Sequence, residues 1–119
     1  MSGTVEFHEV TSDEEASFLL PDGDDALHVV LFCEPGSPTV QKACELAPEV
    51  DIPEDWNLVR LDTEGARRTA RHFGVAELEG MAVVENGTIL DVEYECSLEA
   101  FRRLIEVAKR QSEALDELG

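Results

Sequence analysis

LHVVLFCEPGSPTVQKACELAP, residues 27–48, is the segment that decides the fold. Its residues 29–32 form a continuous apolar run, which is typical of a strand covered on both faces. A Glu-Pro-Gly turn follows, and Ser37 before Pro38 is a common helix start, with a serine cap and proline in the first turn. One apolar stripe with helical spacing comes next: Val40, Ala43, Cys44 and Ala47. Pro48 ends or kinks that helix.

Strands and helices alternate along the rest of the chain. The expected elements, in chain order, are a strand at 5–10, a short helix after a capping box from Thr11 to Glu14, the strand and helix above, a strand at 56–61, a helix from Asp62 or Thr63 through Phe73, strands at 81–85 and 88–95, and a helix that begins at Ser97 and frays after about residue 111. Asn86-Gly87 between the last two strands is a strong hairpin signal. The central strand–helix–strand unit requires parallel strands. Residues 1–119 therefore predict one α/β domain with a central mixed sheet flanked by helices.

The charge of the chain is strongly negative. It carries 27 acidic residues against 9 basic ones, for a net charge of -18, and the acids are spread over every segment. Because 43% of the residues are hydrophobic, the composition is that of a folded protein and not of a disordered acidic tail. Acid-rich, lysine-poor surfaces resemble those of proteins from extreme halophiles, where molar salt screens the repulsion. Nucleic acids and anionic membranes are poor partners for such a surface.

The sequence shows no membrane span and no secretory signal. No apolar run approaches the roughly 20 residues that a membrane helix needs. The N-terminus lacks a basic region followed by an apolar one, so the expected location is the cytoplasm.

Residue types that carry chemistry are few. Three cysteines, an odd number, stand at irregular spacing without a CxxC or HxxxH pair, so no metal or cofactor is expected. The histidines, His8, His28 and His72, are expected to fill surface or core positions. A cluster of three arginines, Arg67, Arg68 and Arg71, could bind an anion, but ion pairs with nearby acids are the preferred interpretation.

Three short segments resemble the thioredoxin family, and the resemblance extends over nearly the whole chain. Residues 57–62 (NLVRLD) are similar to the central strand of the family and its aspartate. Residues 70–75 (ARHFGV) are similar to its helix that ends in aromatic-Gly-Val, and residues 83–87 (VVENG) to its hairpin. The resemblance implies a thioredoxin-like fold and a connection with cell redox homeostasis.

The reactive groups of that family are missing from this chain. Ser37-Pro38-Thr39-Val40 stands where the family has its CxxC dithiol, and Leu31 stands where it has a buried acid. Glu79, followed by Gly80, replaces a cis-proline that faces the dithiol. A serine hydroxyl cannot form a mixed disulfide. The resemblance therefore implies a degenerate active site.

Two functions remain open at this point. One is a redox-inactive module that holds an extended peptide of a protein partner. Its groove would consist of Cys33, Ser37, Pro38, Thr39, Glu79 and Gly80. The other is an atypical thiol–disulfide oxidoreductase that attacks with Cys33 and resolves with Cys44 or Cys96. Against the second function, Cys33 suits a half-buried strand, Cys44 suits core packing, and Cys96 is either a spacer or a contributor.

Overall fold

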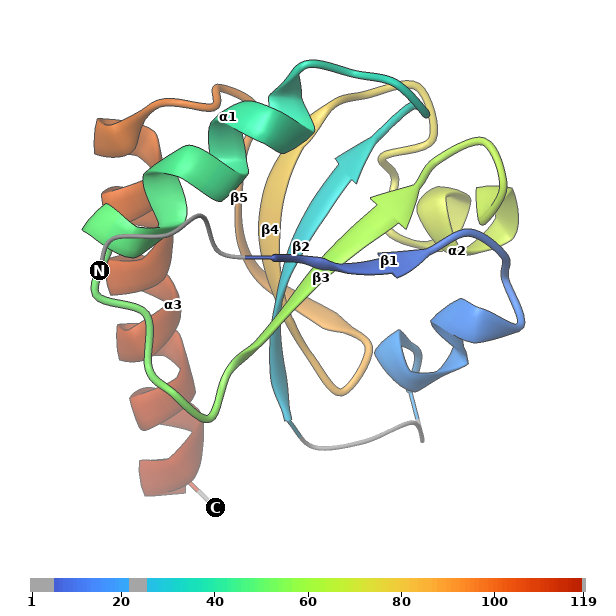
Figure 1. Cartoon of the computed structure of the whole chain (residues 1–119). Helices are drawn as coiled ribbons and strands as arrows, with labels where there is room; N and C mark the ends of the chain where they lie inside the picture. The colour runs from blue at the N-terminus through green and yellow to red at the C-terminus, as the bar shows by residue number, and fades with distance from the viewer. Residues whose placement is uncertain (1–5, 22–25, 119) are drawn as a thin grey trace.

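A computed structural model of the chain describes residues 6–21 and 26–118, with side chains up to residue 113. A five-stranded mixed sheet forms its centre, in the order β1-β3-β2-β4-β5 (Figure 1). The strands are β1 (His8–Val10), β2 (Leu27–Cys33), β3 (Asn57–Asp62), β4 (Gly80–Glu85) and β5 (Thr88–Glu93). β1, β3 and β2 are parallel, whereas β4 is antiparallel to β2 and β5 to β4. The predicted mixed sheet and its parallel central pair are confirmed.

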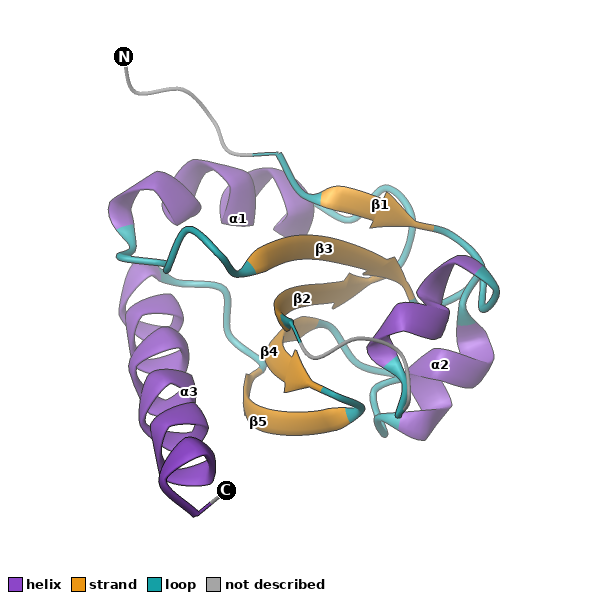
Figure 2. Cartoon of the chain, turned by 90° about the horizontal axis from the view of Figure 1, so that it is seen from below, coloured by secondary structure: helices purple, strands orange, loops and turns teal. Residues whose placement is uncertain are grey.

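Helices cover both faces of this sheet, as Figure 2 shows. They are η1 (Glu15–Leu19), α1 (Thr39–Leu46), η2 (Ala47–Glu49), α2 (Arg67–His72) and α3 (Leu98–Leu118). α1 and α3 pack on one face, over a core that includes Val29, Leu31 and Phe101. η1 and α2 lie on the other face, over a core that includes Val30 and Phe32. The apolar run of β2 thus supplies both cores with alternate side chains, as a strand buried on both faces must.

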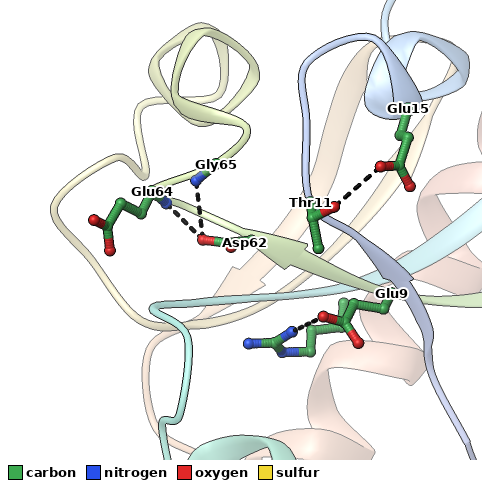
Figure 3. A network of polar contacts seen from close by, with 7 residues as sticks. Glu9, Thr11, Glu15, Asp62, Glu64 and Gly65 are labelled. Atoms are coloured by element: carbon green, nitrogen blue, oxygen red, sulfur yellow. Dashed lines mark hydrogen bonds and ion pairs between the residues drawn. The ribbon is translucent and has the colours of Figure 1, made fainter.

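The first elements differ from prediction by small shifts. The first strand spans only His8–Val10, and residue 5 of the predicted strand lies outside the described part. The predicted capping box is one residue too early, because the backbone N–H of Glu15 donates to Ser12 Oγ at 3.1 Å. Thr11 instead donates its hydroxyl to the Glu15 carboxylate at 3.0 Å (Figure 3). The element that follows is a 3-10 helix whose N-cap residue, Glu14, makes no side-chain cap hydrogen bond.

The helix predicted from Asp62 or Thr63 begins later, at Arg67. Asp62 Oδ1 accepts the backbone N–H groups of Glu64 and Gly65 at 2.9 and 3.0 Å, and so stabilises a turn instead (Figure 3). A Cβ on Gly65 would lie 2.1 Å from the carbonyl oxygen of Thr11, so the turn is pressed against the N-terminal segment. This tertiary contact delays the start of α2.

The hairpin and the last helix form as predicted. Asn86 and Gly87 both have positive φ, 47° and 79°, as a two-residue type I′ turn requires. The hydroxyl of Ser97 accepts the N–H of Ala100 at 3.1 Å and caps α3. The backbone is helical to Leu118, and fraying after about residue 111 stays a prediction. No helix in the described residues is long and apolar enough to cross a membrane.

Candidate binding site at the start of helix α1

Ser37 connects the start of α1 to the loop before β4. Its hydroxyl oxygen accepts the N–H of Thr39 at 3.3 Å, which satisfies one of the free amides of the helix N-terminus. The same hydroxyl donates to Glu79 Oε2 at 3.1 Å, across 42 residues of sequence. The two positions where the resemblance places a dithiol and a facing proline are therefore joined by a serine–glutamate hydrogen bond.

Gly80 lets the end of β5 approach the start of β4 closely, next to this bond. A Cβ at this position would lie 2.5 Å from the Glu93 carbonyl oxygen, 2.9 Å from Tyr94 Cα and 3.0 Å from Phe32 Cζ. With glycine in place, the Tyr94 ring packs edge-on against Phe32, with the ring centroids 6.2 Å apart. Tyr94 nevertheless remains 58% exposed.

Leu78 and Tyr94 are the large hydrophobic residues that the described part of the chain exposes, at 41% and 58%. Leu78 immediately precedes Glu79, and Tyr94 lies against Gly80. Both therefore border the loop that contacts Ser37. The sequence does not single them out, because Leu78 lies in an irregular connection and Tyr94 continues the strand alternation of Leu90 and Val92, which predicts a packed side chain. The only available signal was their closeness to Glu79-Gly80 and to the end of the hairpin strand.

The predicted groove residues divide into surface and interior. Ser37 and Glu79 are in contact, and Pro38 and Thr39 follow Ser37 at the start of α1. Gly80 and Cys33 are buried, the latter with no exposed surface at all. The exposed part of the groove consequently lies around Ser37 and Glu79.

The three cysteines are free thiols in separate surroundings. Burial raises the pKa of Cys33, although the guanidinium of Arg60 beside it lowers that pKa in part. Burial also raises the pKa of the half-buried Cys44 and of the half-buried Cys96. The Cys96 thiol points to the carbonyl oxygen of Thr39, at 4.0 Å. Because the thiolate is the nucleophile, a raised pKa lowers the reactive fraction of each thiol at neutral pH.

The arginine cluster on α2 forms the kind of contact that the sequence predicts for it. Arg67 Nη2 pairs with Glu77 Oε1 at 2.6 Å, and the charge of Arg68 lies near the Asp13 carboxylate. Arg71 is exposed.

The three histidines occupy different environments. His28 is buried in β2, with its ring 5.0 Å from that of Phe18, while His8 and His72 are exposed. Within residues 6–21 and 26–118, no cluster of three or more His, Cys, Asp or Glu side chains could hold a metal ion.

Comparison with solved structures identifies the fold. No protein-family model matches the sequence, and a search of curated proteins finds no relative. The structure resembles the thioredoxin of Malassezia sympodialis (Mala s 13), with a TM-score of 0.68 and 9% identity, over 93% of this chain and 96% of that one. It resembles the oxidised thioredoxin of Plasmodium falciparum, with a TM-score of 0.68 and 17% identity, over 85% and 96% of the two chains.

A mutant thioredoxin from Halobacterium salinarum also superposes, with a TM-score of 0.64 and 15% identity, over 89% of this chain and 93% of that one. Identities this low carry the fold and leave the activity open. The shared architecture of a mixed five-stranded sheet with helices on both faces agrees with the resemblance seen in the sequence. The chain therefore has the thioredoxin-like fold.

Proposed function

We propose that this protein is a redox-inactive binding module, related to cell redox homeostasis, that holds an extended segment of a partner protein against the start of α1. The observation that supports it is the hydrogen bond from Ser37 to Glu79 at 3.1 Å. The helix N-terminus, where a thiolate would be stabilised, carries a hydroxyl group with a carboxylate beside it. A negative charge at that place opposes the formation of a thiolate nearby.

The exposed side chains around this bond suit a peptide. Leu78 and Tyr94 offer apolar surface, and aromatic residues are common anchors at protein interfaces. The carboxylate of Glu79, which follows Leu78, and the hydroxyl of Ser37 offer polar groups. An extended segment could therefore place apolar side chains on Leu78 and Tyr94 and direct its polar groups toward Ser37.

The alternative, an oxidoreductase that uses Cys33 with Cys44 or Cys96, lacks this kind of support. An attacking thiol must be accessible and partly ionised. Cys33 has no exposed surface, and burial raises the pKa of each of the three thiols. Titration of the thiols with a chromogenic disulfide separates the two functions, because the oxidoreductase requires a Cys33 pKa well below about 8.5.

The binding proposal is tested by probing an array of short random peptides with the protein in molar salt. Peptides that bind are then titrated into isotopically labelled protein, and the backbone signals that shift are mapped. We expect shifts at Ser37, Glu79 and Tyr94, and affinity about tenfold weaker for Tyr94→Ser, as for an interface anchor. Leu78→Ser should weaken the same peptides. Gln111→Ser, an exposed change on α3, is the control.

Two results would contradict this function. One is binding that maps to another face of the sheet. The other is binding that neither Leu78→Ser nor Tyr94→Ser weakens, with both variants folded.

The net charge of -18 supports a working environment of molar salt inside the cell. Under that proposal the negative charge keeps the protein soluble, and the salt screens the repulsion between its carboxylates.

A further inference from the structure

A hollow lies between the N-terminal segment and the start of α1. Its volume is about 680 Å³, within the usual range for small-molecule sites. Phe7, Val40 and Cys44 give it apolar walls, and its polar groups come from Glu6, Glu9, Ser37, Gln41 and Arg60. Ser37 lines this hollow as well as the peptide site proposed above, whereas Leu78, Glu79 and Tyr94 of that site do not line it.

Arg60 is the basic residue of this cavity, and it is largely buried. Its side chain, on β3, is only 11% exposed. One guanidinium nitrogen donates to Glu9 Oε1 at 3.0 Å, the contact drawn beside Glu9 in Figure 3. Its Nε–H is buried and has no hydrogen-bond acceptor among the described residues, while the thiol of Cys33 lies beside the guanidinium. A buried donor without an acceptor is costly. Because that nitrogen is itself inaccessible, a molecule in the hollow would reach the guanidinium by replacing Glu9.

We propose that this cavity binds a small carboxylate that carries an apolar body. The planar guanidinium of Arg60 matches a carboxylate with two parallel hydrogen bonds. The apolar body would lie on Phe7, Val40 and Cys44. The first turn of α1, which also borders the cavity, presents the positive end of the helix dipole.

When no ligand is bound, the Glu9 carboxylate pairs with the Arg60 guanidinium. Its side chain is 61% exposed, so it can leave Arg60 for solvent at little cost. Glu9 and the ligand carboxylate then compete for the same guanidinium. A cationic ligand would behave in the opposite way, because it would need Glu9 as its partner.

A matched set of three probes tests this inference: phenylacetate, the neutral phenylacetamide and the cationic phenethylamine. Each is titrated into isotopically labelled protein in molar sodium chloride, and the amide signals are followed by NMR. We expect phenylacetate to shift the signals of Phe7, Glu9 and Gln41, with a Kd on the order of millimolar for so small a ligand. The amide and the amine should bind at least about tenfold more weakly, as loss of a charged hydrogen bond predicts.

Two substitutions, each with a matched control, test the roles of Arg60 and Glu9 in binding. Arg60→Met keeps the aliphatic stem and should abolish the shifts, whereas Arg71→Met, which removes the same charge from the exposed face of α2, should leave them unchanged. Glu9→Gln should tighten phenylacetate several-fold, while the exposed Glu106→Gln should have little effect. If Arg60→Met does not fold, the Glu9→Gln comparison and the three probes still test whether the hollow binds a carboxylate.

Three outcomes would overturn the inference. They are absence of any shift with phenylacetate, equal binding of phenylacetate and phenylacetamide, and preferential binding of phenethylamine that Glu9→Gln weakens.

Discussion

Replacement of Gly80 by alanine tests the packing that shapes the proposed binding site. The added methyl group would lie 2.5 Å from a backbone oxygen of Glu93 and 2.9 Å from Tyr94 Cα. Neither atom can turn aside as a side chain can, so the cost should reach the upper end of overpacking, about 3 kcal/mol. Alanine also restricts the unfolded chain, which offsets about 0.4–1 kcal/mol. The net loss should be about 2 kcal/mol, or about 8 °C in Tm for a domain of this size.

Urea unfolding in molar salt gives the free energy, and NMR of the Tyr94 ring reports the local change. We expect the ring resonances to move, because Tyr94 must shift away from Phe32. Gly36→Ala is the control, since nothing lies within 4 Å of its Cβ and its φ of +79° is the only obstacle. That variant should lose about 1 kcal/mol, as a left-handed residue does, and leave the Tyr94 ring unmoved. Gly80→Ala with unchanged stability would refute the packing described around β4 and β5.

Three further outcomes follow from charges and hydrogen bonds. The Tm should rise between about 0.05 M and 2 M salt as carboxylate repulsion is screened, and a constant Tm would contradict the halophile interpretation. Asp13→Ala should cost about 1–2 kcal/mol in urea unfolding, because Asp13 Oδ1 accepts the Thr69 N–H and hydroxyl at 2.8 and 2.9 Å; a loss that persists fully in a Thr69→Val background, which keeps the N–H, would show that the hydroxyl bond contributes nothing. The hydrogen bond from Arg103 lowers the pKa of Glu93 from its ordinary 4.5, so this pair stabilises the fold above that pH and the effect is lost as pH falls through the lowered pKa. Arg103→Met should raise the Glu93 pKa in an NMR titration, and an unmoved pKa would exclude the pair as its cause.

The sequence predicts those parts of the fold that local patterns determine. The apolar run at 29–32 predicts β2, and Asn86-Gly87 predicts the hairpin, because each signal lies within the element that it forms. The start of α2 could not be predicted in the same way. It depends on Gly65 packed against the Thr11 carbonyl and on Asp13 bonded to Thr69, contacts between distant segments.

The candidate site shows the same division. The positions of Ser37 and Glu79 came from the family resemblance, and their contact crosses 42 residues that no local pattern connects. The burial of Arg60 could not be predicted, because arginine is usually exposed and the alternation of its strand gives no sign of the cavity. The exposure of Leu78 and Tyr94 depends on how the loop before β4 meets the end of β5. Such surface features are set by packing between elements and are invisible in the order of residues.

The central claim, that this thioredoxin-like fold carries no dithiol chemistry, is tested most directly by reduction of a small protein disulfide in molar salt. The assay compares the wild type, Cys33→Ser and the double variant Ser37→Cys/Val40→Cys. We expect no turnover above background from the wild type or from Cys33→Ser, since no thiol occupies the start of α1. The double variant should show low activity, because a CxxC pair at a helix N-terminus is restored without the other reactive groups. Substantial wild-type turnover that disappears in Cys33→Ser would contradict the claim and establish the oxidoreductase.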